Sequence, residues 1–140
     1  MRHYPDNSPA AAARLIALTL LADGGMDPSE LAALERSQVL AQLGISYPQF
    51  QQVLLELCAD ALQYSDWPGM QQLAGDPAVL DRLLGEISDP GKQVTVLRAM
   101  LDVADADQQL TDSERTVLGR AMQCWHPALQ RSGTRLAQAA

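Results

Sequence analysis

Two closely similar stretches of nine residues, 84 positions apart, constrain the fold of this chain most strongly. Residues 22–30 read Ala-Asp-Gly-Gly-Met-Asp-Pro-Ser-Glu, and residues 106–114 read Ala-Asp-Gln-Gln-Leu-Thr-Asp-Ser-Glu. An apolar run with helical spacing precedes each stretch, and another follows it. An acidic turn that occurs twice between paired helices indicates an internal duplication with pseudo-twofold symmetry.

Each stretch carries the signals of a helix start. In the first, Asp27 stands at the N-cap, a proline occupies the first helical position, and Glu30 falls at the third. Residues 111–114 repeat this capping box without the proline. Asp23 and Asp107 are not needed for the cap, and each is expected at the C-terminal end of the preceding helix. A carboxylate there opposes the helix dipole, which indicates a further role for the two aspartates.

Helix-start signals recur along the rest of the chain and predict an all-α fold. Ser8, Asp76 and Asp89 each stand directly before a proline, as an N-cap stands before the first helical residue. Ser46 and Gln49 form a further capping box, and a glycine two positions before Ser46 is placed to end the preceding helix. We expect helices at about residues 9–21, 28–43, 47–61, 77–87, 90–104 and 112–125.

With one short helix after residue 69 and another in the tail, these elements predict a single compact domain of seven to eight helices, built from two related halves. Residues 8–63 form the first half and residues 76–125 the second, with a loose leader at 1–7 and a tail at 126–140. Because 47% of the residues are hydrophobic and only 4% are aromatic, the core must consist mainly of Leu, Ala, Val and Met. No segment shows the alternation that is typical of a strand.

Composition narrows the classes of partner and the compartment. A formal charge of −7 argues against a partner held through a phosphate backbone, and so against nucleic acid, and against docking on an anionic membrane. It favours cations. No apolar run reaches the ~18 residues of a spanning helix, so we expect no integral membrane protein. Two cysteines in a chain with ample core material indicate a reducing compartment, the cytoplasm.

No catalytic constellation is visible, and we expect no enzyme. No Ser or Cys is accompanied by the base and the orienting residue that nucleophilic catalysis requires. Cys124 and His126 offer a thiol and an imidazole as ligands for a soft metal or metalloid. Residues two apart on a helix, however, point to different sides. We therefore expect Cys124 to be a buried and inert thiol that packs as a small hydrophobe.

Residues 22–30, the Leu-Gly-Ile-Ser at 43–46, and Ala106, Asp107 and Glu114 together resemble the TerB-like family, the bacterial tellurite-resistance superfamily. The resemblance covers roughly residues 15–125. It implies a compact helical domain of two related halves, a role in the response to tellurite and other toxic agents, and cation binding by acidic residues. Two departures stand out: Gln108 replaces the glycine expected after Asp107, and Trp-His-Pro at 125–127 replaces a second Leu-Gly-Ile ending.

The resemblance implies a metal site in which the two turns converge on one divalent ion. Oxygen ligands alone would select a hard cation, Ca²⁺, Mg²⁺ or Mn²⁺. The alternative is that these side chains are ordinary helix caps and bind no ion. The turn is not an EF-hand, because the sixth loop position, counted from Asp105, is Leu110 and not glycine. The predicted ligands are Asp23, Glu30, Asp107 and Glu114, with Asp27 and Asp105 as additional candidates.

An interaction module is the rival function. The irregular middle of the chain, residues 63–75, contains Tyr64, Trp67 and Met70, which would form a recognition patch if exposed. The alternative is a loop that covers the core between the two halves. Similar domains in this broad family are accessory modules fused to chaperone or membrane components. Docking to a protein partner in a stress-response complex therefore remains open beside metal binding.

Overall fold

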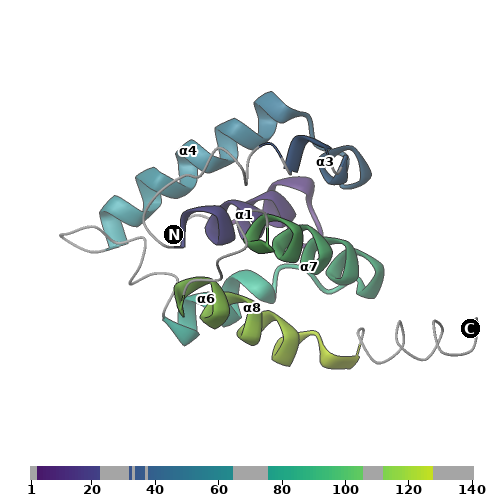
Figure 1. Ribbon diagram of the computed structural model, residues 1–140. Coiled ribbons are helices and arrows are strands. Elements are labelled where there is room, and N and C mark those ends of the chain that lie inside the picture. Colours follow the sequence, from purple (N-terminus) through teal and green to yellow (C-terminus); the bar gives the residue numbers. More distant parts are fainter. Residues whose placement is uncertain are drawn as a thin grey trace, which may run out of the picture.

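The structure is a computed structural model that describes residues 3–22, 32, 34–36, 38–64, 76–105 and 112–127. Within these residues the secondary structure is helical, without a strand, as the sequence predicts (Figure 1). The helices pack into one compact domain. They are α1 (Pro9–Leu21), α3 (Val39–Gln42), α4 (Tyr47–Tyr64), α6 (Pro77–Leu84), α7 (Pro90–Asp105) and α8 (Asp112–Cys124).

Helix α1 forms the centre of the domain. It packs mainly against α4 on one side and α7 on the other, and it also contacts α6 and α8 (Figure 1). As a result, every residue from Ala11 to Leu21 is buried. A helix that is apolar on nearly all sides belongs in a core, and the alanines in α1 let its neighbours approach closely. The single charged residue of α1, Arg14, is buried as well.

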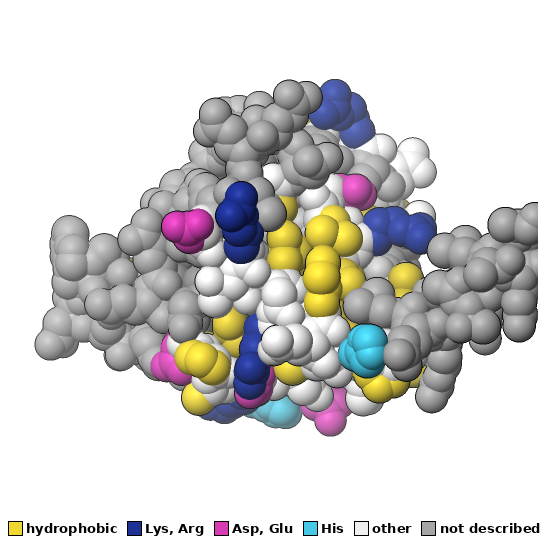
Figure 2. Space-filling model, turned by 60° about the horizontal axis from the view of Figure 1, so that its bottom comes forward, with side chains coloured by type: hydrophobic (Ala, Val, Ile, Leu, Met, Phe, Trp, Pro, Cys, Tyr) yellow, Lys and Arg dark blue, Asp and Glu magenta, His cyan; other side chains and the backbone are white. Residues whose placement is uncertain are grey.

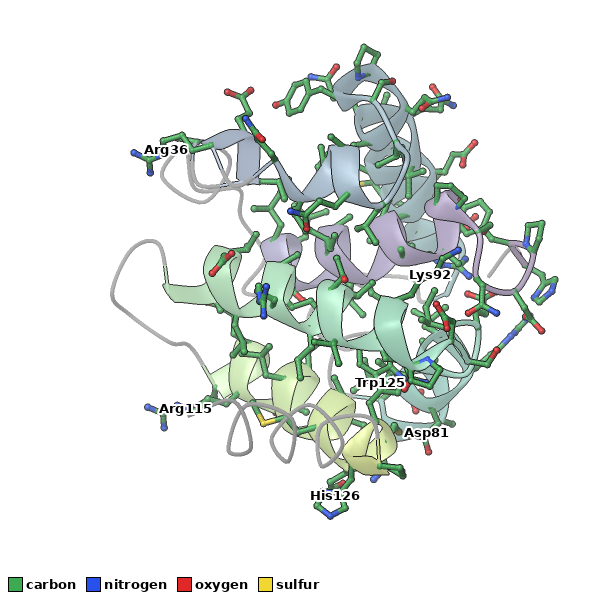
Figure 3. The ribbon with its side chains drawn as sticks, turned by 90° about the vertical axis from the view of Figure 1, so that its right-hand side faces the viewer. Arg36, Asp81, Lys92, Arg115, Trp125 and His126 are labelled. Atoms are coloured by element: carbon green, nitrogen blue, oxygen red, sulfur yellow. The ribbon has the colours of Figure 1, made fainter. Side chains whose placement is uncertain are left out.

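Helices α1 and α7 begin side by side. Asn7, directly before the N-cap of α1, accepts hydrogen bonds at Oδ1 from the backbone N–H groups of Ser88 and Asp89, both at 2.9 Å. Lys92 in the first turn of α7 donates to the Asn7 carbonyl at 2.6 Å. Since the two helices also pack against each other, they run in the same direction, and their last residues lie at the same end of the molecule (Figure 3).

The predicted helix starts are confirmed where the structure describes them. Ser8 accepts a hydrogen bond from the Ala11 N–H at 3.1 Å, and Asp76 accepts one from the Ala78 N–H at 3.0 Å. Ser46 and Gln49 bond each other reciprocally at the start of α4, at 2.9 and 3.3 Å. These signals could be read from sequence because each involves residues at most three positions apart.

The prediction of one continuous helix over residues 28–43 is wrong. Gln38 has a positive φ of 57° and separates the helical residues 34–36 from α3. In an unbroken helix, Leu34 and Leu40 would be roughly 120° apart around the axis and would point toward different sides. The break at Gln38 lets both leucines be buried, with Leu40 on a short helix that contacts α7.

Residues 3–7, for which the sequence predicts a loose leader, are instead held against the helices. Besides the contacts of Asn7, the Tyr4 hydroxyl donates to Glu56 of α4 at 2.6 Å.

At the other end of the chain, Trp125 is buried and donates its indole N–H to the Leu84 carbonyl at 3.4 Å. In the residues that the structure describes, no helix is both long and apolar enough to cross a membrane.

Candidate functional site

One of the predicted metal ligands, Glu114, has a described side chain. It is the third residue of α8 and is only 1% exposed, whereas Asp112 in the same turn is exposed. A carboxylate can be buried to this degree only where hydrogen bonds or positive charge offset the loss of water. The first turn of a helix supplies part of that compensation through its free N–H groups and its dipole.

The turn of Glu114 lies at the end of the molecule where α1 and α7 finish. Arg115, its neighbour in α8, is seen at this end in Figure 3 beside the last turn of α7. The structure therefore places a buried carboxylate near the point at which the chain leaves both parallel helices. An oxygen donor in this position fits a hard cation.

The other predicted site residues lie wholly or partly outside the described part of the chain. Asp105 is the last residue of α7, and Tyr64 is the last residue of α4, but the side chains of both lie outside the described part. Among the described residues, no three His, Cys, Asp or Glu side chains form a group that could hold a metal ion. Fully outside the described residues are Asp23, Asp27, Glu30, Asp107, Trp67 and Met70.

A buried charge cluster beneath the N-terminal segment was not predicted from the sequence. Arg14 in α1 forms an ion pair with Glu86, which follows α6. The backbone N–H of Tyr4 donates to the second oxygen of Glu86 at 3.2 Å, and His3 Nδ1 lies 3.0 Å from the same oxygen. Both carboxylate oxygens are thus engaged, one by the core helix and one by the N-terminal segment.

Tyr4 covers the same arginine. Its ring centroid lies 4.3 Å from the Arg14 guanidinium carbon, in cation–π geometry. The signal that could have revealed the cluster is Arg14 itself, because an arginine inside an apolar helix is almost never fully buried unless it is paired. The cluster ties residues 3–7, α1 and α4 to the α6–α7 junction, and we assign it a structural role.

A second polar cluster lies on the surface between α6 and α8. Arg120 donates two hydrogen bonds to Asp81, at 2.6 and 2.5 Å, in the bidentate geometry that arginine and carboxylate favour. Asp81 and Trp125 both lie near the last turns of α8 in Figure 3. The hydrogen bond from Arg120 lowers the pKa of Asp81 below its ordinary value.

The expectation that Cys124 is a buried thiol is wrong. Cys124 is exposed, and its Sγ lies 3.5 Å from the carboxylate of Asp81. The buried face of α8 is formed by positions 114, 117, 118 and 121 and continues at Trp125, so residue 124 lies at its edge. Partial desolvation raises the pKa of the Cys124 thiol, and the hydrogen bond to Asp81 raises it further. A thiol with a raised pKa is a poor nucleophile at neutral pH, so the pair does not favour thiol catalysis.

Comparison of the chain with protein-family models, with curated proteins and with solved structures gives no match.

Proposed function

We propose that this protein is a non-catalytic helical domain of the bacterial stress response, similar to TerB-like proteins, that binds a divalent cation at the end of the molecule where α1 and α7 finish. The observation that carries the proposal is the parallel packing of α1 and α7. Their last residues, Leu21 and Asp105, are 84 positions apart, the same offset as between the two acidic stretches. The chain therefore leaves both helices at one end and enters a similar acidic stretch after each.

The short distance along the chain from each helix end to its aspartate supports a meeting of the two turns. Asp23 and Asp107 each follow the last helical residue by two positions, and two residues span at most about 7 Å. Both aspartates would thus remain near the helix ends, on the side of the molecule that holds the buried Glu114. Asp23, Glu30, Asp107 and Glu114 would hold the ion, with Asp27 or Asp105 nearby.

The chemistry of these donors selects the ion. Carboxylate oxygens without nitrogen or sulfur favour Ca²⁺, Mg²⁺ or Mn²⁺. When bound, the ion would neutralise part of the formal charge of −7 and join the two turns. A cytoplasmic location and a role in tellurite resistance are part of this proposal and rest on the sequence resemblance and on the two cysteines, which form no disulfide with each other.

Isothermal titration of the full chain with each of the three cations tests the proposal. We expect heat with at least one ion and a rise of the melting temperature in its presence, because an ion that binds only the folded state stabilises it. Glu114→Gln should lose both responses. Asp112→Asn, in the same first turn but exposed, is the matched control and should keep them. No heat with any of the three ions would contradict the proposal.

Docking of a protein partner without metal is the second candidate function. It is favoured by large apolar side chains on the described surface, among them Leu101 of α7 and Met122 of α8, 39% and 40% exposed. Figure 2 shows hydrophobic side chains gathered in the middle of one face, with basic and acidic side chains around them. Melting that does not respond to cations, with loss of a purified partner on Trp67→Ala or Leu101→Glu, would favour this function over metal binding.

A further inference from the structure

Helix α4 carries a second apolar stripe on the side that faces away from the core. One face of α4, which includes Phe50, Val53 and Leu57, is buried in the domain core. On the opposite side, Leu55 is 63% exposed and Leu62 is 72% exposed, more than the other large hydrophobic side chains found exposed on the described surface. Ala59 lies between them and is also exposed. A helix that only covers its own core does not need this stripe.

The spacing of the stripe is that of a helix–helix seam. Gln52, Leu55, Ala59 and Leu62 follow one another at intervals of three, four and three residues. This alternation places side chains along one line of a helix and is the spacing with which two helices pack together in a coiled coil. The stripe is therefore shaped to receive another helix, with a small alanine at the point where two axes could approach most closely.

The order of the side chains favours a second copy of the same helix. Leu55, Ala59 and Leu62 read almost the same in both directions along α4. In an antiparallel pair related by a twofold axis, Leu55 of one copy would face Leu62 of the other, and the two Ala59 residues would lie beside the axis. A twofold contact requires this kind of self-complementary surface.

Charge favours the same occupant. A net charge of −7 opposes self-association in general, so a contact between copies must avoid exposed carboxylates. Helix α4 contains no Lys or Arg, and its two acidic residues are engaged within the domain. Glu56 accepts the hydrogen bond of Tyr4 at 2.6 Å, and Asp60 is buried. The stripe is bordered by glutamines and offers little to attract a basic partner helix.

We infer that α4 forms an antiparallel contact with α4 of a second copy, so that the protein is a weak homodimer in solution. An 18-residue helix is about 27 Å long, and a pair of such helices makes a contact at the small end of the range for protein interfaces. The dimer should therefore depend on concentration. It rests on residues distant from the cation site and should form equally in the presence of a chelator.

Sedimentation of the full chain over roughly 1 to 500 µM, which brackets the affinity of a small interface, tests the inference. We expect a shift from monomer to dimer that Leu55→Glu combined with Leu62→Glu abolishes. Both positions are exposed, so melting of this variant should show an intact fold. Leu101→Glu combined with Met122→Glu is the control, because it adds the same two charges at exposed positions of α7 and α8 and should leave the dimer unchanged. A monomer at every concentration, or a dimer that survives the double substitution, would overturn the inference and leave a different partner as the occupant of the stripe.

Disulfide trapping tests the orientation. In a background of Cys58→Ala and Cys124→Ser, oxidised Ala59→Cys should link to itself across the twofold axis. A mixture of Leu55→Cys and Leu62→Cys chains should form mixed disulfides in preference to links between identical chains. Preferred links between identical Leu55→Cys chains would show a parallel pair and overturn the antiparallel arrangement.

Discussion

The carboxylate of Glu86 pairs with the guanidinium of Arg14 inside the protein, although 72 positions separate the two residues in the chain. Their side chains are 5% and 1% exposed. Removal of two charges from water is unfavourable, and only close pairing with further hydrogen bonds offsets it. The pair therefore fixes the α6–α7 junction against the core helix with a specificity that apolar contacts alone do not provide.

Replacement of Glu86 by Gln should destabilise the protein severely. The substitution leaves the buried Arg14 without its charged partner at this site, and loss of one member of a buried pair costs on the order of 3 kcal/mol. Urea denaturation measures the loss. The double variant Arg14→Met with Glu86→Leu should recover a large part of it, because apolar side chains of similar volume replace both charges. Equal loss in the single and double variants would contradict this account.

Two substitutions of Tyr4 separate its hydrogen bond from its ring. Tyr4→Phe keeps the ring over Arg14 and removes the bond to Glu56, which should cost about 1–2 kcal/mol for a charged acceptor at a partly buried site. Tyr4→Ala should cost a further ~1 kcal/mol, since the cation–π contact and the ring's buried area are lost as well. Urea denaturation of the two variants gives the difference. Stabilities equal to that of the native chain would mean that the N-terminal segment does not contribute.

The sequence predicts the local features of this fold and misses the distant ones. The starts of α1, α4 and α6 depend on caps within a few residues, and all three are confirmed. The pairing of Arg14 with Glu86 brings together positions far apart in the chain, so no local pattern contains it. The helix break at Gln38 was not predicted for a similar reason, since burial of Leu40 against other elements decides where the helix breaks. Of the candidate metal site, the sequence proposes Glu114 as a ligand but does not predict its deep burial.

The pair of Asp81 and Arg120 should stabilise the protein above about pH 4 and lose its effect in acid. Because Arg120 lowers the pKa of Asp81, the folded state binds its proton less readily than the unfolded state, whose pKa is about 3.9. Stability from the pair is therefore present above the unfolded pKa and disappears as the pH falls through the lower, folded pKa. The melting temperatures of the native chain and of Asp81→Asn should therefore converge as the pH falls. Salt should reduce the difference, since both side chains are more than one-third exposed. A difference that is constant with pH would contradict the assignment.

The thiol of Cys124 should react slowly with alkylating agents for an exposed cysteine. Partial desolvation and the neighbouring Asp81 raise its pKa, so less reactive thiolate is present near pH 8. Asp81→Asn removes the second of these causes and should accelerate the reaction. The rate of iodoacetamide alkylation against pH, measured in a Cys58→Ser background, gives the apparent pKa. Asp112→Asn, on α8 but at its other end, should leave the rate unchanged; acceleration by both substitutions would point to net charge and not to the contact with Asp81.

Two glycine-to-alanine substitutions should have opposite effects on stability. Gly44, which ends α3, has a φ of +78°, a conformation that costs an L residue roughly 1 kcal/mol. The nearest atom to an added Cβ there is Pro9 Cγ at 4.0 Å, so Gly44→Ala should be destabilised by backbone strain alone. Gly119 lies in α8 with nothing within 4 Å of an added Cβ. Gly119→Ala should therefore stabilise the helix by roughly 0.5–1 kcal/mol, since alanine loses less conformational entropy on folding. Urea denaturation of both variants measures the two signs, and a stabilised Gly44→Ala would show that residue 44 adopts another backbone conformation in solution.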